Sequence, residues 1–314
     1  MEHWNSYWHQ TKSLNSFAED ESSPGYNGAV LDYWHQLFAS FPTGSTILDV
    51  ATGNGALAVS LVDFSNTVKA NFQVLASDLA AIQPLSTIAA QPDVLKLLRQ
   101  VCFYSETPTE QLPFAQNSLD AVISQFGFEY SKRKAAMQEV LRVLKPTGSF
   151  SAMIHHRSSV LTKDCESGLA FYSDVADCHF FAVATELLTI ADSEPKQLSS
   201  QQRTQYLNKK LFKLAQDLQG ICVNTTKEYW CQDFLQRVSP LFMQVKPGHL
   251  QLLKRFQHDI LSHEARLNDQ LASAWSEQDA EDFSACVLRA GHQSNISPFL
   301  LDNDLFGWTL KMTK

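Results

Sequence analysis

The 314-residue chain lacks the patterns that mark several common protein classes. No uninterrupted apolar run reaches the roughly 18 residues of a membrane-spanning helix, so we expect no membrane segment. The six cysteines include no C-x-x-C pair, and the polar start, rich in Trp and His, predicts no secretory leader. These absences favour reduced thiols in a cytoplasmic protein. The spacing of His and Cys also indicates no metal site.

An excess of basic residues is missing too. Lys and Arg number 25 against 33 Asp and Glu, which leaves a formal net charge of -8. Proteins that bind nucleic acid neutralise its phosphates with Lys and Arg, so the negative net charge argues against a nucleic-acid partner. A local basic patch is still compatible with this net charge. The length suits one large domain or a domain with a sizeable insertion.

Strand and helix patterns alternate from residue 44 to residue 157. Apolar runs predict strands at 45–50, 71–78, 101–105, 118–126 and 148–156, with helical patterns at 56–64, 80–99 and 134–145 between them. This alternation predicts a mostly parallel sheet covered by helices on both faces. Four polar residues fall at or just after predicted strand ends, and we expect them along one edge: Asp49, Asp78, Gln125 and His155.

The rest of the chain predicts additions to this sheet. Residues 1–43 are expected to form an N-terminal helical lid segment, 44–157 the cofactor-binding core, and 158–268 a helical insertion that serves the substrate. Residues 269–314 then return to the core with a last helix and two strands. The predicted fold is an α/β, doubly wound, Rossmann-like and mostly parallel seven-stranded sheet with a C-terminal β-hairpin.

Residues 46–59, "TILDVATGNGALAV", read as a strand, a glycine turn and a helix that hold a nucleotide-like ligand. Gly53, Gly55 and Ala58 satisfy G-x-G-x-x-A, one form of the dinucleotide fingerprint. Asp49 at the strand end does not suit a pyrophosphate, because its charge would repel one; it attracts a cationic ligand instead. The loop alone is therefore compatible with two chemistries.

Three later segments accompany the "LDVATGNG" loop in order: "VLASDLA", "EQLPFAQNSLDAVISQFGFEY" and "EVLRVLKPTGSF". Together they resemble the class I S-adenosylmethionine-dependent methyltransferases, in particular the small-molecule group around the ubiquinone and menaquinone biosynthesis C-methyltransferases. The resemblance runs from about residue 44 to residue 155 and includes the last two strands. No (N/D)-P-P-(Y/F) element follows the fourth predicted strand, which disfavours methylation of exocyclic amino groups on bases.

The resemblance implies S-adenosyl-L-methionine as cofactor and a set of residues that bind it: Asp49, Ala51, Thr52, Gly53, Gly55, Asp78, Leu79, Glu106, Gln125 and Phe126. Gly53 and Gly55 allow the backbone to turn tightly beside the ligand. Ala51 stands in a glycine slot of the motif and suits it if its φ is negative. Pro108 stands where the family has an adenine-binding acid, so Glu106 or backbone N–H groups of 106–108 are expected there.

The sequence also offers candidates for the catalytic residue, the lid and the methyl acceptor. His155 is the catalytic candidate, as a general base or an orienting group, although a histidine at a strand end is often only hydrogen-bonded. The aromatic residues Trp4, Tyr7, Trp8 and Tyr26 either form a lid or attach a first helix. We expect a small-molecule methyl acceptor. An RNA or protein methyltransferase and a non-catalytic cofactor-binding protein are the alternatives, and the oligomeric state is open, a homodimer included.

Overall fold

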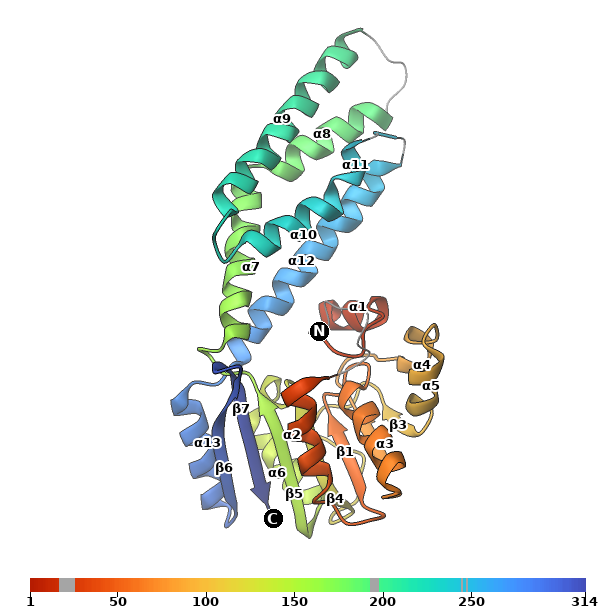
Figure 1. Cartoon of the computed structure of the whole chain (residues 1–314), viewed down its shortest axis with the longest axis vertical. Helices are drawn as coiled ribbons and strands as arrows, with labels where there is room; N and C mark the ends of the chain where they lie inside the picture. Colours follow the sequence, from red (N-terminus) through yellow and green to blue (C-terminus); the bar gives the residue numbers. More distant parts are fainter. Residues whose placement is uncertain (17–25, 193–197, 244, 247) are drawn as a thin grey trace. The chain divides into compact units, whose positions relative to one another are not determined.

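A computed structural model describes residues 1–16, 26–192, 198–243, 245–246 and 248–314. The chain forms two compact units, which we call the core, Met1–Thr162 with Ser273–Lys314, and the helical unit, Lys163–Ala272 (Figure 1). The chain leaves the core within one helix and returns within another. The predicted lid segment, 1–43, includes residues 17–25, which lie outside the described residues.

The core contains a seven-stranded sheet in the order β3-β2-β1-β4-β5-β7-β6. Its strands are β1 (Thr46–Val50), β2 (Gln73–Ser77), β3 (Val101–Tyr104), β4 (Leu119–Gln125), β5 (Leu144–Ile154), β6 (Gln293–Leu301) and β7 (Asp304–Thr313). The first five are parallel, and β7 lies antiparallel between β5 and β6. The predicted α/β fold with its C-terminal hairpin is therefore confirmed. Strand order reverses between β1 and β4, where such sheets bind ligands.

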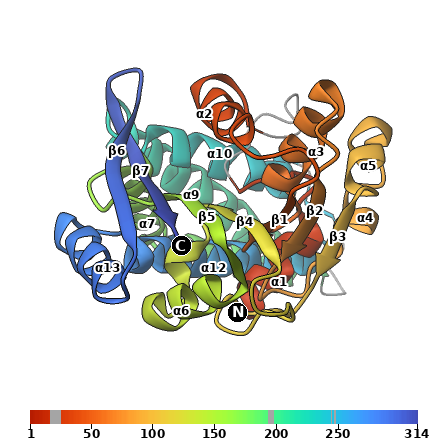
Figure 2. The ribbon, with the colours of Figure 1, turned by 90° about the horizontal axis from the view of Figure 1, so that it is seen from below.

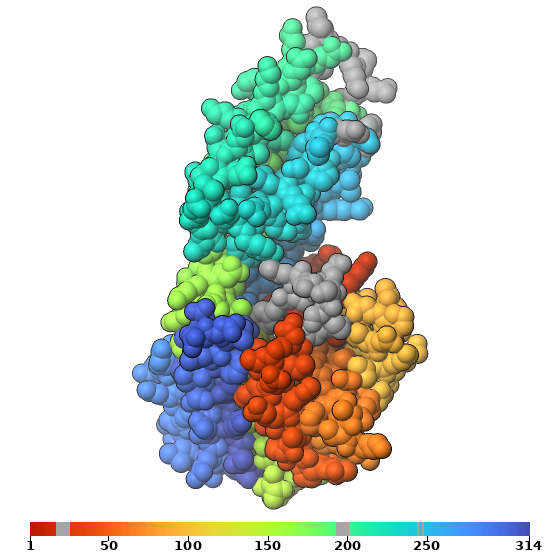
Figure 3. Space-filling view, viewed as in Figure 1, coloured from red at the N-terminus to blue at the C-terminus, as the bar shows by residue number. Residues whose placement is uncertain are grey.

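Helices cover both faces of this sheet. The core helices are α1 (Glu2–Gln10), α2 (Gly28–Phe38), α3 (Ala56–Val68), α4 (Pro84–Thr87), α5 (Pro92–Leu98), the 3₁₀ turn η1 (Phe128–Tyr130), α6 (Arg133–Val143) and α13 (Glu277–Arg289). Figure 2 shows α2 and α3 on one face and α6 and α13 on the other. Alternate strand residues serve the two faces, since Ile47 packs with α2 and α3 while Leu48 packs with α6 and α13. Figure 3 shows α2 between α3 and the β6–β7 hairpin.

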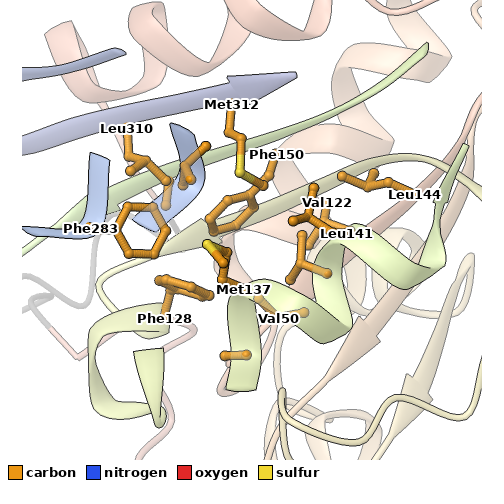
Figure 4. Close-up of a cluster of buried hydrophobic side chains, with 14 of the residues drawn as sticks. Val50, Val122, Phe128, Met137, Leu141, Leu144, Phe150, Phe283, Leu310 and Met312 are labelled. Atoms are coloured by element: carbon orange, nitrogen blue, oxygen red, sulfur yellow. The ribbon is translucent and has the colours of Figure 1, made fainter. Parts of the chain in front are cut away.

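The face under α6 and α13 is built from aliphatic, aromatic and methionine side chains (Figure 4). The Phe128 ring lies 4.7 Å from the Phe150 ring and 5.9 Å, edge to face, from that of Phe283. Because Phe128 begins η1, this packing anchors the turn that follows β4. The segment after β4 therefore has a defined position at the ligand-binding edge.

One predicted boundary differs from the structure. The helix predicted to run to residue 145 ends at Val143, and β5 begins at Leu144 with Pro146 and Gly148 inside it. The β4–β5 register shifts at this point, between Leu119 and Ala121. A register shift of this kind is where a strand tolerates proline, because the missing N–H has no ladder partner to lose.

The helical unit has its own hydrophobic core. Its helices are α7 (Val160–Asp177), α8 (Phe180–Asp192), α9 (Leu198–Cys222), α10 (Glu228–Val238), α11 (Pro240–Met243) and α12 (His249–Ser273), of which α7 and α12 extend into the core at their ends. Phe171, Phe180 and Phe234 are buried together at its centre. Within the described part of the chain, no helix combines the length and the apolarity that a bilayer crossing needs.

Candidate active site

The loop after β1 turns through three residues with positive φ: Ala51 at 54°, Gly53 at 57° and Gly55 at 92°. Ala51 therefore does not meet the condition of a negative φ under which it suits this glycine slot. An L-residue in this region costs about 1–2 kcal/mol, and space has to be made for its side chain. Gly127, just after β4, makes that space, because a Cβ built there would lie 2.4 Å from the Ala51 Cβ. The loop and the segment after β4 are therefore in close contact.

Asp49 lies within β1 and is 1% exposed. The Thr52 hydroxyl donates to its Oδ2 at 2.5 Å. Burial raises the pKa of this carboxyl from 3.8 to about 7; the Thr52 hydrogen bond opposes the rise, and the nearby charge of Asp78 adds to it. Within the described residues no basic side chain forms an ion pair with Asp49.

Asp78 follows β2 and joins two loops through its carboxylate. Oδ2 accepts the N–H of Gly53 at 2.7 Å, and Oδ1 accepts the N–H of Ala80 at 2.7 Å. Burial raises the pKa of Asp78 to about 6 despite these two hydrogen bonds. A carboxylate has about four acceptor sites, so the two oxygens can still accept further hydrogen bonds from a diol.

Leu79 and Glu106 are two further residues expected to bind the cofactor, and Glu106 is the one expected at the adenine. Leu79 is 48% exposed, and Glu106 is exposed with a φ of 53°. The N–H of Glu106 donates to Ala80 O at 3.3 Å, and that of Thr107 donates to Asp78 O at 2.7 Å. Pro108 has no N–H, so none of the backbone N–H groups of 106–108 is free for a ligand. The expectation that these N–H groups bind adenine is therefore wrong. The roles of the Leu79 and Glu106 side chains stay predictions.

The side chains of Gln125 and Phe126 lie in different surroundings. The Gln125 side chain is buried, accepts a hydrogen bond from Trp34 Nε1 and donates one to Met153 Sδ at 3.4 Å. It is thus turned into the core under α2, contrary to the expected contact with the cofactor. Phe126, with a φ of 51°, places its ring 4.3 Å from the His155 ring. Phe126 therefore adjoins the catalytic candidate.

His155 directly follows β5 and is hydrogen-bonded to Glu129, a residue that the sequence analysis missed. Glu129 Oε1 lies 2.6 Å from His155 Nδ1 and accepts the backbone N–H of His155 at 2.8 Å. The signal available in the sequence was an acid in the turn after the fourth strand, together with a histidine at the end of the fifth. Because β4 and β5 are parallel neighbours, their carboxyl ends bring such residues together.

The N-terminal helix α1 packs directly on this loop. A Cβ on Gly53 would lie 2.5 Å from the Trp8 ring. Asn54 Nδ2 donates to Trp8 O at 3.3 Å, and the N–H of Ala81 donates to Asn5 Oδ1 at 2.9 Å. Trp8 thus covers the backbone surface that Gly53 leaves open. Whether α1 acts as a lid stays a proposal.

Tyr26, the last of the aromatic residues named from the sequence, also belongs to this region. Burial raises the pKa of its phenol, and the charge of Asp49 raises it further. Its ring packs against the buried clusters formed by α2, α3 and α5.

Among the described residues, no group of three or more His, Cys, Asp or Glu side chains could hold a metal ion.

Residues 48–152 match the family model of a methyltransferase domain. The chain is 33% identical over 107 residues to the ubiquinone/menaquinone biosynthesis C-methyltransferase UbiE of Rickettsia prowazekii, a stretch that covers 34% of this chain and 42% of that protein. The match to the enzyme of the same name from Haemophilus ducreyi is 32% over 108 residues, 33% of this chain and 39% of that one. The chain therefore spans about two fifths of the length of these curated relatives.

Among solved structures, the chain is similar to a putative S-adenosyl-L-methionine-dependent methyltransferase from Methanococcus maripaludis. That likeness covers 89% of this chain and 83% of the other, with 14% identity and a TM-score of 0.41. The family model and the curated relatives support a class I S-adenosylmethionine-dependent methyltransferase domain in residues 48–152. S-adenosylmethionine is the cofactor of that class.

Proposed function

We propose that the chain is a methyltransferase that transfers a methyl group from S-adenosylmethionine to a small-molecule acceptor. The observation that carries this proposal is the pair of buried acids, Asp49 and Asp78, beside a loop opened by Gly53 and Gly55. Burial raises the pKa of both carboxyls, the charge of Asp78 raises that of Asp49 further, and within the described residues neither acid has a basic partner in an ion pair. Such a site favours a ligand that brings positive charge.

The chemistry of the cofactor fits this electrostatic environment. S-adenosylmethionine carries an ammonium group and a sulfonium, and its ribose offers two hydroxyls. Asp49 is suited to the cation and Asp78 to the diol, while a dinucleotide would place a pyrophosphate next to the Asp49 carboxylate. Since an acid in the place of Asp78 binds the ribose of either cofactor, it is Asp49 that favours methyl transfer over hydride transfer with a nicotinamide cofactor.

The reaction is an in-line displacement at the methyl carbon, so the protein mainly positions the acceptor and excludes water. We assign the water-excluding role to the N-terminal segment 1–43, on the ground that Trp8 and Asn5 contact the cofactor loops. We assign the choice of acceptor to the helical insertion 158–268, since additions to a shared core carry specificity. The 107-residue similarity to UbiE, a ubiquinone/menaquinone biosynthesis C-methyltransferase, supports a small-molecule acceptor.

A second candidate is an RNA or protein methyltransferase, and one feature of α9 favours it. Lys209, Lys210 and Lys213 are exposed there, beside Phe212 at 66% and Tyr206 at 54% exposure. Lysines interleaved with aromatic rings suit a single-stranded nucleic acid. Transfer of a labelled methyl group to RNA, with loss after charge reversal of these lysines, would favour this candidate over a small acceptor.

Calorimetry tests the proposed cofactor site. We expect the full chain to bind S-adenosylhomocysteine and not NADH, and Asp49→Ala to abolish the first interaction. Asp63→Ala, at an exposed acid on α3, is the matched control and should bind as the wild type does. Unchanged affinity of Asp49→Ala would refute the assignment of the site. Binding without turnover on any acceptor would instead indicate a non-catalytic cofactor-binding protein.

A further inference from the structure

Glu129 and His155 form a buried pair at the ends of neighbouring strands. Glu129 lies in η1, which follows β4, and its side chain is fully buried; the His155 side chain is 2% exposed. One carboxylate oxygen, Oε1, binds both the backbone N–H and the ring Nδ1 of His155. These two contacts define the orientation of the imidazole.

The contact with Nδ1 also determines which ring nitrogen carries the proton. A carboxylate oxygen at 2.6 Å accepts a proton, so Nδ1 of the neutral ring is the donor and the lone pair lies on Nε2. A carboxylate beside Nδ1 further stabilises the imidazolium that forms when Nε2 takes up a proton. This arrangement is that of a general base held by an acid, the same logic as in hydrolase triads.

The stability of the fold alone does not explain why residue 129 is a glutamate. Glu129 Oε2 is buried and has no hydrogen-bond partner within the described residues. Leaving such an atom unpaired destabilises the fold, and more so when the group is charged. A glutamine could accept the same two hydrogen bonds through its single oxygen without a charge. The carboxylate therefore adds what glutamine cannot, a negative charge beside the imidazole.

The pair borders the cofactor loop. Gly127, two residues before Glu129, packs on Ala51, and Phe126 lies against His155. The Tyr130 ring lies 6.1 Å from the His155 ring and 5.7 Å from that of Trp4, which belongs to the same helix as Trp8. The histidine is thus connected by direct ring contacts to the elements that surround the proposed methyl donor.

We propose that His155 is the general base of the methyl transfer, that Glu129 is its positioning residue, and that the acceptor is a protic nucleophile such as a phenol, a thiol or an acidic carbon. This inference rests on the proposed function. As the acceptor atom bonds to the methyl carbon, the carbon–sulfur bond breaks and its electrons go to sulfur, giving neutral S-adenosylhomocysteine. The acceptor's proton passes to His155 Nε2 and then to water.

The test uses the full chain with S-adenosylmethionine labelled in its methyl group. The acceptors are phenols, arylthiols and cyclic 1,3-diketones, each class with a weakly acidic and a strongly acidic member, plus tertiary amines, which have no proton to lose. The variants are Glu129→Gln, Glu129→Asp and His155→Asn. His156→Gln is the matched control, because His156 is an equally buried neighbour that stacks on Trp308 instead.

We expect transfer to protic acceptors, with kcat lowered about 100-fold or more in Glu129→Gln and His155→Asn and with KM little changed. Glu129→Asp should recover part of the rate. The loss should shrink for a strongly acidic acceptor such as 4-nitrophenol, which ionises by itself at about pH 8. A purely structural role would lower the rates for weak and strong acids by the same factor, and that result would overturn the proposal.

Other outcomes separate this inference from the function on which it rests. Failure of the wild type to bind S-adenosylhomocysteine would refute the proposed function. If the wild type binds S-adenosylhomocysteine but methylates only tertiary amines, or no protic acceptor, the role of His155 as general base is refuted. The assignment of the cofactor site is not affected by that result. Calorimetry of each variant with S-adenosylhomocysteine controls for folding, since the cofactor site itself should be intact in all of them.

Discussion

Asp49 is the residue at which stability and ligand binding are expected to oppose each other. Its pKa is raised from 3.8 to about 7, so the folded protein holds a proton that the unfolded chain releases. A difference of about 3 pKa units corresponds to about 4 kcal/mol. This stabilising contribution is complete below about pH 3.8 and is lost as the pH rises through about 7, because the folded protein must then keep a buried negative charge.

Asp49→Asn removes that charge and keeps an oxygen for the Thr52 hydroxyl. Relative to the wild type, its free energy of unfolding should therefore grow with pH, by about 2–3 kcal/mol between about pH 5 and about pH 8. Denaturant unfolding followed by tryptophan fluorescence measures this, since five of the six tryptophans lie in the core. A difference that does not change with pH would refute the reasoning.

Asp120→Asn is a control with the opposite sign. Partial burial raises the pKa of Asp120, but hydrogen bonds from Lys145 Nζ at 2.8 Å and from the Thr46 N–H at 2.8 Å hold it below its usual value. The ionised carboxylate therefore stabilises the fold at neutral pH. Asp120→Asn should be destabilised there, and the destabilisation should fade as the pH falls through the range in which Asp120 takes up its proton.

Asp49→Asn should also bind the cofactor more weakly than the wild type does. A hydrogen bond between charged groups contributes about 1.5–3 kcal/mol, so we expect S-adenosylhomocysteine to bind about 10- to 150-fold more weakly. In the wild type the affinity should also fall about 10-fold for each pH unit below about 7, as Asp49 becomes protonated. Calorimetry at several pH values checks both effects, and pH-independent wild-type binding would contradict them.

Three further substitutions test backbone features. Gly53→Ala, at a φ of 57° and 2.5 Å from the Trp8 ring, should abolish S-adenosylhomocysteine binding in calorimetry. Gly220→Ala, in α9 with nothing within 4 Å, should instead stabilise the helical unit by about 0.5–1 kcal/mol in denaturant unfolding followed by circular dichroism. Ser276→Ala removes the capping box of α13 and should cost about 1 kcal/mol, a fall of about 2–4 °C in melting temperature; an unchanged value would show that the cap is dispensable.

The sequence by itself determined the order of elements, the sheet class and the place of the cofactor loop. These follow from local signals: apolar runs of strand length, helical spacing and the turn chemistry of Gly53 and Gly55. Asp49 and Asp78 were found in the same way, since each follows or ends a predicted strand and parallel strands present their carboxyl ends on one edge.

The tertiary structure alone decided how individual side chains are used. Ala51 adopts a positive φ because Gly127, 76 residues away, leaves it space, and Gln125 turns into the core because Trp34 of α2 binds it. The pairing of Glu129 with His155 depends on β4 and β5 being neighbours, which no spacing along the chain records. Local patterns determine where the chain turns; the direction and partners of a side chain depend on residues that only folding brings together.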